Sequence, residues 1–185
     1  MLLIVELFVF LLIVLVLFIF YIIFIYNSLV RLKNNITKAW SNIEVLLKQR
    51  YDELPKLIDT VKGYTIHEKS VLTDLIKIRS DYKGAKDIHD IAEINDKTDD
   101  LIKKSFLVFE KYPDLKADGN FLKLQKRISE IENMISDRRE YYNDVVTIYN
   151  TRIEQIPYNL IANSLKYKPK DLFVANDSEK KNIRI

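Results

Sequence analysis

A histidine next to a carboxylate is the arrangement in this sequence that comes nearest to a chemical site. His67 and Glu68 are neighbours in a segment predicted to be helical, but the residue four positions after His67 is Val71. The zinc-binding helix of metalloproteases needs a second histidine at that position. The other histidine, His89, lies near a predicted loop and has no evident partner. We therefore predict no metal site and no cofactor, and a solvated or capping pair at residues 67–68.

Paired carboxylates and activated nucleophiles are the other chemistry to consider. Asp52-Glu53 and Asp99-Asp100 could form acid–base pairs, but neighbouring residues of a helix point about 100° apart, which favours solvated helix faces. No serine lies in a Gly-x-Ser-x-Gly turn, and the chain has no cysteine. We predict no catalytic residues and a protein that is not an enzyme. A hydrolase is the alternative, with the His–Glu pair as its sole support.

Aromatic, guanidinium and amide side chains form a third set of candidates. The set consists of Trp40, Arg50, Tyr51, Arg79, Tyr142, Asn143 and Asn150. In a helical bundle, such residues place their aromatic rings inside while their guanidinium and amide groups bond one another. This interpretation predicts a structural core, and a groove for a partner protein is the alternative.

An apolar N-terminal segment precedes all of these residues. Positions 7–26 are twenty consecutive apolar or aromatic residues, and Glu6 is the only charge before them. A helix of that length spans about 30 Å, the thickness of a hydrocarbon core. No basic residue precedes the run and no small-residue cleavage site follows it, so we expect a transmembrane helix and not a signal peptide. Residues 2–26 are thus predicted to contact the lipid bilayer.

The residues after the apolar run predict its orientation. Arg31, Lys33 and Lys38 lie within residues 27–43, which contain no acid. Basic residues next to a membrane favour the cytoplasmic side. We expect a single-pass protein of the cell membrane with its soluble domain in the cytoplasm and its N-terminus outside.

The remaining composition favours one helical domain. Every basic residue lies after the apolar run, interspersed with acids, and the net charge of the chain is only +3. Nucleic-acid-binding proteins usually gather basic residues on one face, so we predict no nucleic-acid partner. Three glycines and four prolines in 185 residues suit helices and not a phosphate-binding loop, and we predict no small-molecule substrate.

Apolar periodicity predicts the helices of this domain. Spacings of three and four indicate one helix over residues 27–84, kinked at Pro55 and softened at Gly63. Further helices are expected over 87–112 and 121–156, separated by a loop. The predicted fold is all-α: a single N-terminal transmembrane helix, then an elongated antiparallel bundle of three long helices, the first kinked into two segments, plus a short C-terminal helix.

The predicted helix lengths divide the chain and leave one surface uncovered. We expect a transmembrane helix at 1–26, the bundle at 27–156, and a short helix with a basic tail packing on the bundle at 157–185. The first helix outruns its partners near the membrane. The possible interaction surface consists of Leu32, Ile36, Trp40, Ile43 and Leu47. We predict that the tail or a second copy covers it, which gives self-association. The tail is interpreted as a strap, with an anionic membrane surface as the alternative contact.

Several blocks of the soluble part resemble the LemA family. They include Tyr-Pro-Asp-Leu-Lys at 112–116 and Asn-Phe-Leu-Lys-Leu-Gln at 120–125, and all lie in the family's order. The other blocks are residues 26–30, 39–45, 50–55, 57–64, 67–68, 79, 138–139, 142–143, 149–150, 156–157 and 159–162. The chain departs from the family near its end, where Leu-Lys-Tyr at 165–167 stands in place of Phe-Gly-Phe and a late proline is missing.

The resemblance implies a bacterial membrane protein with a long helical bundle, and it brings no established catalytic residues. One branch of the family serves in magnetosome membranes, which hints at membrane organisation. We therefore predict a membrane-anchored, non-enzymatic interaction or scaffold protein of the bacterial cell membrane with an unknown protein partner. The alternative is a laterally assembling protein that organises or remodels the membrane.

Overall fold

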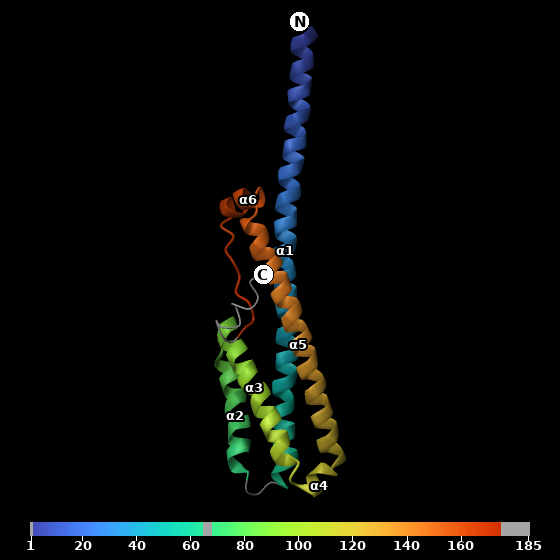
Figure 1. Cartoon of the computed structure of the whole chain (residues 1–185), viewed down its shortest axis with the longest axis vertical. Helices are drawn as coiled ribbons and strands as arrows, with labels where there is room; N and C mark the ends of the chain where they lie inside the picture. The colour runs from blue at the N-terminus through green and yellow to red at the C-terminus, as the bar shows by residue number, and fades with distance from the viewer. Residues whose placement is uncertain (1, 65–67, 175–185) are drawn as a thin grey trace. The chain divides into compact units, whose positions relative to one another are not determined.

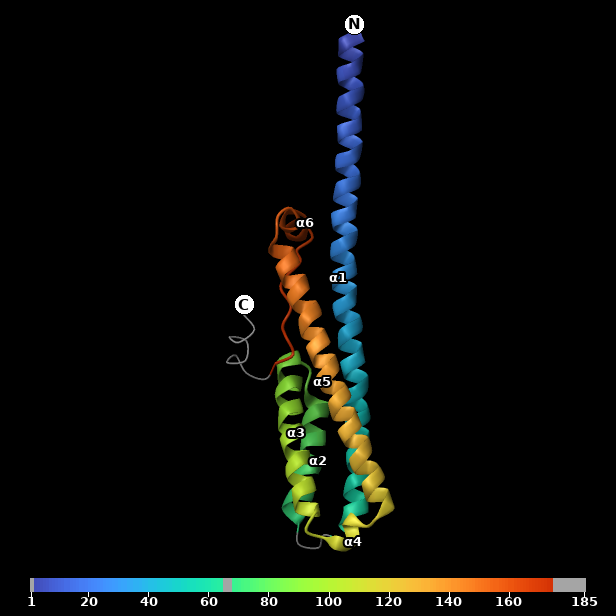
Figure 2. The same cartoon turned by 45° about the vertical axis from the view of Figure 1, so that its right-hand side comes forward.

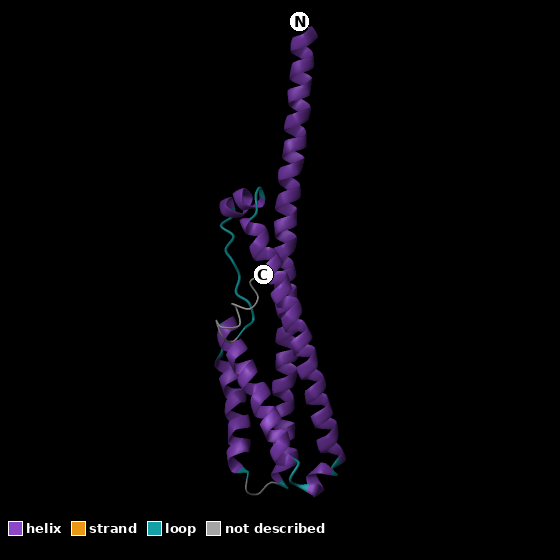
Figure 3. Ribbon diagram, in the orientation of Figure 1, coloured by secondary structure: helices purple, strands orange, loops and turns teal. Residues whose placement is uncertain are grey.

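The computed structural model describes residues 2–64 and 68–174, which form six helices and no strand (Figures 1 and 3). The helices are α1 Leu2–Lys62, α2 Lys69–Gly84, α3 Ile88–Phe109, α4 Pro113–Lys116, α5 Gly119–Glu154 and α6 Tyr158–Ser164. The predicted all-α fold with one long apolar N-terminal helix is confirmed. His67 and the predicted tail beyond residue 174 lie outside the described residues.

These helices divide into two compact units. Unit 1 holds the chain up to Lys38 together with Asp144–Lys170, and unit 2 holds Ala39–Asn143 together with the chain from Asp171 onward. Helices α1 and α5 therefore each contribute one part to both units. Within α1 no loop separates the apolar run from the polar helix that follows, because the helix is continuous from Leu2.

Unit 1 pairs the beginning of α1 with the end of α5 and with α6. Every apolar side chain from Leu2 to Phe24 is exposed, whereas Ile25 and Leu29 are buried. By length and composition, the exposed segment is able to cross a membrane. Lipid would cover the apolar side chains that the protein itself leaves bare. Burial by the protein therefore begins where the apolar run ends.

The predicted helix over 27–84 is in fact two helices. Helix α1 ends at Lys62 and α2 begins at Lys69, so Gly63 marks the end of a helix and not a soft point inside one. Glycine disfavours helix continuation, and the chain reverses here so that α2 runs antiparallel to α1 within unit 2 (Figure 1). Pro55 stays inside α1, as expected from a periodicity that keeps its phase there.

Unit 2 is an antiparallel bundle of α1 from Ala39 onward, α2, α3 and α5 up to Asn143 (Figure 2). Its apolar core includes Ile43, Leu47, Leu54, Leu57, Leu75, Ile102, Phe109, Leu115, Ile128 and Ile131, all fully buried. The short α4 turns the chain from α3 into α5. The Asp118 carboxylate accepts bonds from the backbone N–H groups of Asn120 (2.7 Å) and Phe121 (2.9 Å), which caps α5 and lowers the pKa of that carboxyl.

Candidate interaction surfaces

The predicted interaction surface on α1 is largely buried inside the protein. Ile36, Ile43 and Leu47 are buried, and Leu32 and Trp40 are half-buried. This burial leaves little of the surface for a second copy, and self-association through it stays a prediction.

Residues of the C-terminal tail lie against the same stretch of α1. In unit 1 the Lys33 ammonium lies 5.3 Å from the ring centroid of Tyr167. In unit 2 the Trp40 ring contacts Phe173 edge-on, with 5.6 Å between ring centroids, and Tyr142 at 5.7 Å. The tail thus contributes aromatic cover to the helix that carries the apolar run.

Residues 168–174, here called the strap, are held along α5 by side chains that bond their main chain. In unit 1 the Tyr149 hydroxyl donates to the carbonyl of Lys168 (3.2 Å). The Asn150 amide donates to the Lys170 carbonyl (2.9 Å) and accepts from the Lys170 N–H (2.8 Å). One asparagine therefore satisfies both backbone groups of a strap residue, much as a neighbouring β-strand would.

The same pattern holds the strap in unit 2. The Tyr142 hydroxyl donates to the carbonyl of Asp171 (3.1 Å), and Asn143 accepts from the N–H of Phe173 (2.8 Å). Arg139 donates through Nε to the Phe173 carbonyl (2.9 Å). The Phe173 ring is fully buried. Main-chain bonds position the strap, and the side chains of Phe173 and Val174 are buried.

Burial raises the pKa of the two tyrosines that bond the strap. Burial raises the pKa of Tyr142 to about 12 and also raises the pKa of Tyr149, so both hydroxyls remain protonated donors at neutral pH. His89 contacts the strap as well, with 3.3 Å between its Nδ1 and the carbonyl oxygen of Val174. The expectation that His89 has no partner was wrong, because its partner is 85 residues away in the sequence.

A buried polar cluster lies inside unit 2. The Arg50 guanidinium, fully buried, forms an ion pair with Asp99 and donates to the Asn95 side chain (2.9 Å). The Tyr51 hydroxyl shares a hydrogen bond of 2.9 Å with Thr98. Burial raises the pKa of the Asp99 carboxyl more than the Arg50 charge lowers it.

The structure separates the two acids of the 99–100 pair. Asp100 is exposed as expected, whereas Asp99 turns inward to Arg50, so the prediction of a solvated face was wrong for Asp99. Adjacent helical residues point in different directions, which is why only one of them reaches the core. Near this cluster, Glu132 Oε1 and Arg50 Nε are buried and have no hydrogen-bond partner among the described residues. Burial raises the pKa of the Glu132 carboxyl.

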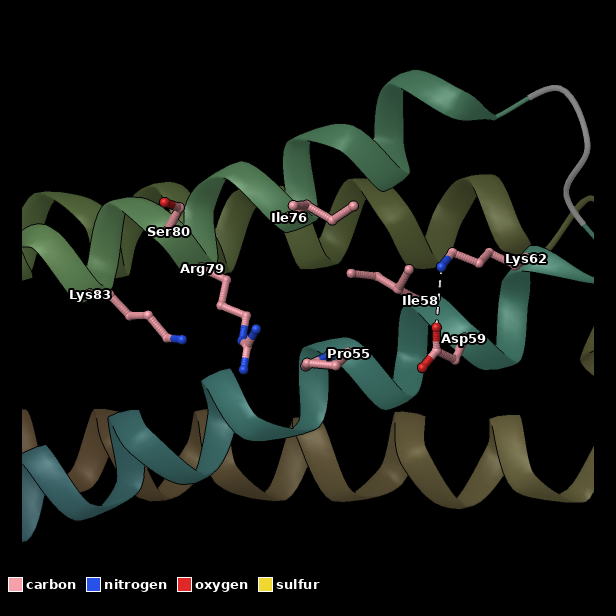
Figure 4. Close-up of a pocket in the computed structure, with 8 residues that line it drawn as sticks. All are labelled: Pro55, Ile58, Asp59, Lys62, Ile76, Arg79, Ser80 and Lys83. Carbon is pink, nitrogen blue, oxygen red and sulfur yellow. Dashed lines mark hydrogen bonds and ion pairs between the residues drawn. The ribbon is translucent and has the colours of Figure 1, made fainter.

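A groove lies between α1 and α2 in unit 2, and it begins with Pro55. Proline has no N–H, so the carbonyl of Tyr51, four residues earlier, loses its helical partner. The Nε of Arg79, on α2, donates to that carbonyl (3.3 Å). The groove has a volume of about 340 Å³. It is lined by Pro55, Ile58, Asp59, Lys62, Ile76, Arg79, Ser80 and Lys83 (Figure 4).

The groove has an apolar middle and basic ends. Figure 4 shows Ile58 and Ile76 between its two ends, with Arg79 and Lys83 towards one end and Lys62 at the other. Ile76 is 54% exposed, so its side chain is accessible from the groove. Lys62 pairs with Asp59 at 3.3 Å on the surface. Such a lining suits an acidic segment that carries an apolar side chain.

Within residues 2–64 and 68–174, no three or more His, Cys, Asp or Glu side chains lie close enough together to hold a metal ion. Glu68, the described member of the His–Glu pair, accepts a hydrogen bond from the Tyr112 hydroxyl (3.3 Å). Glu68 thus contacts the loop before α4.

Comparison with known proteins identifies the family of this chain. The profile of the LemA family matches residues 39–185, most of the chain. The chain belongs to the LemA family. Protein LemA of Metamycoplasma hominis is similar to it, with 30% identity over 158 residues, which cover 85% of this chain and 72% of the relative. Neither the family description nor the relative's name states an enzymatic activity.

Sequence reasoning identified some of the residues that form these clusters and contacts in this LemA family chain, and it missed others. It singled out Arg50, Tyr142, Asn143 and Asn150, which the structure places in the buried cluster and along the strap. It missed the groove lysines, because lysine on a helix is ordinarily solvated. The available signal was Ile76, which lies off the apolar stripe that Leu75 and Ile78 continue.

Proposed function

We propose that this LemA family chain is a non-enzymatic interaction protein of the bacterial cell membrane. The apolar part of α1 anchors it, the bundle lies in the cytoplasm, and the α1–α2 groove binds an acidic segment of another protein. The observation that carries the proposal is Ile76, exposed between the basic ends of the groove.

The charges of the groove support this kind of partner. Lys62, Arg79 and Lys83 are its basic residues, and Asp59 is its one acid. An acidic segment would therefore be attracted, while the exposed isoleucine would accept an apolar side chain. A groove of this size gives weak binding by itself, but a partner held at the same membrane reaches a high effective concentration.

Photo-crosslinking in cells tests the groove. A benzoylphenylalanine probe at Ile76 should yield a discrete adduct with another protein. The adduct should be lost when Lys62→Glu and Lys83→Glu are added, because both ends of the groove then repel an acidic segment. A matched pair, Lys104→Glu with Lys123→Glu, reverses two exposed charges elsewhere and should leave the adduct intact.

A probe at Leu107, which is 65% exposed on α3, serves as the positional control. An Ile76 adduct that survives the groove substitutions, or that also forms at Leu107, would argue against the groove as a specific site. If no adduct formed at Ile76, no protein would be bound in the groove, and the proposal would be contradicted.

Lateral assembly in the membrane is the second candidate. The apolar part of α1 exposes large side chains all around the helix, from Leu2 to Phe24, and either lipid or another copy can cover them. Full-length protein added to liposomes should then form tubules or ordered arrays visible by electron microscopy. Vesicles that stay smooth and carry only dispersed protein would contradict this second function.

A further inference from the structure

Residues 155–160, which comprise the link after α5 and the first turn of α6 and are here called the α5–α6 turn, expose two large apolar side chains outside the apolar run. Ile156 is 82% exposed and Leu160 is 68% exposed, and both belong to unit 1. No apolar side chain of the segment 2–24 is more exposed than Ile156. Exposed apolar side chains only four residues apart are candidates for contact with a membrane or a partner.

The architecture of unit 1 locates this turn along α1. Helix α6 lies beside α1, past the end of α5, in both views (Figures 1 and 2). Ile25 and Leu29 are buried, and the only other segment of unit 1 is Asp144–Lys170, so that segment must cover them. Ile25 falls within the apolar run of residues 7–26, about 1.5 Å of helix rise from its end. Unit 1 therefore reaches the level at which α1 enters the hydrocarbon core.

The residues around the turn have the chemistry of a membrane interface. The Arg152 guanidinium lies 4.7 Å from the Tyr158 ring centroid, and Lys33 lies over the ring of Tyr167. Lys166 and Lys168 are exposed. Tyrosine and basic side chains are favoured at headgroup level, where an apolar body and a polar tip can both be satisfied.

We propose that the α5–α6 turn inserts Ile156 and Leu160 into the headgroup region of the bilayer that α1 crosses. The inference rests on the proposed membrane anchor and is independent of the α1–α2 groove. The bilayer would then contact unit 1 at two places, at α1 and at the turn. Two contacts restrict the tilt of α1, which a single helix cannot do alone.

Fluorescence from single cysteines tests the insertion, because the chain has no cysteine of its own. Full-length Ile156→Cys and Leu160→Cys proteins carry an environment-sensitive dye in nanodiscs of phosphatidylcholine and phosphatidylglycerol. Both dyes should emit at shorter wavelength and should be quenched by lipids spin-labelled near the headgroup. Thr147→Cys, exposed on α5 in the same unit and about 10 Å of helix before its end, should keep the emission of a dye in water.

A fourth variant separates the two ways in which the inference can fail. Leu15→Cys lies in the apolar run, and its dye should be quenched by lipids that carry the spin label deep in the acyl chain. Quenching at Leu15 together with water-like emission at Ile156 and Leu160 would overturn the insertion and leave the anchor standing. Water-like emission at Leu15 would overturn the anchor and the insertion with it. Deep quenching at Ile156 or Leu160 would overturn the interfacial location.

Discussion

At the scale of single residues, the interior of unit 2 holds a carboxylate whose charge is poorly compensated. Glu132 Oε1 is buried without a hydrogen-bond partner among the described residues, and burial raises the pKa of its carboxyl. A raised pKa means that the folded state binds the proton more tightly than the unfolded state does. The contribution of Glu132 to the free energy of unfolding is therefore highest below the unfolded-state pKa and is lost as pH rises through the folded-state pKa.

Glu132→Gln should remove this pH dependence. At pH 7 we expect the substitution to raise the free energy of unfolding by on the order of 1 kcal/mol, because no buried charge remains. Below pH 4 the carboxyl is already protonated, so the difference should vanish. Urea unfolding in detergent micelles, followed by circular dichroism at both pH values, measures it. Glu130→Gln, on the exposed face, is the control and should change the free energy of unfolding little. A lower free energy of unfolding for Glu132→Gln at pH 7 would contradict the prediction.

The Arg50 ion pair gives a second residue-scale prediction. Arg50→Met leaves the Asp99 carboxylate and the Asn95 amide without their partner, so the free energy of unfolding should fall by roughly 3 kcal/mol. Adding Asp99→Leu removes the stranded charge and should restore part of the loss. Arg127→Met removes an exposed arginine and should have little effect. Urea unfolding measures the free energy of each variant. If the Arg50→Met, Asp99→Leu double variant were less stable than Arg50→Met alone, the argument would be refuted.

At the scale of elements, the strap depends on one enclosed ring. Phe173→Ala should destabilise the attachment of the strap by about 3 kcal/mol, because the fully buried ring leaves a cavity. The backbone N–H of Phe173, which donates to Asn143, should then exchange with deuterium at least tenfold faster by mass spectrometry. Asp171→Ala should leave exchange unchanged, since α5 bonds only the Asp171 carbonyl. Equal protection in both variants would show that main-chain bonds alone hold the strap.

The elements also show what the sequence can and cannot predict. Apolar periodicity located α3 and α5 to within a few residues, because each presents one continuous face to the core. The same periodicity kept its phase past Gly63, so the reversal between α1 and α2 was invisible to it. The strap could not be predicted from a sequence pattern either. Side chains of α5 bond its backbone, so its own residues need no apolar periodicity. Asn150 was a candidate by residue type, but its double bond to Lys170 needed the structure.

At the scale of the whole molecule, the side of the membrane that holds the bundle decides which partners are available. Arg31, Lys33 and Lys38 follow the apolar run, and basic residues resist translocation, so the bundle is expected in the cytoplasm. A single Lys104→Cys, exposed on α3, should be protected from a membrane-impermeant maleimide in intact cells and should react after lysis. Leu2→Cys, at the opposite end of the apolar run, should react in intact cells.

The two cysteines together make the result decisive, because a helix that spans a closed membrane leaves one of them accessible and protects the other. Labelling of Lys104→Cys and protection of Leu2→Cys would place the bundle outside the cell. The acidic partner of the groove would then have to be sought in the cell envelope, and the three basic residues would face the outer surface. Protection of both before lysis would mean that the N-terminus does not reach the far side. The apolar run would then enter the bilayer without spanning it, even though its length suffices.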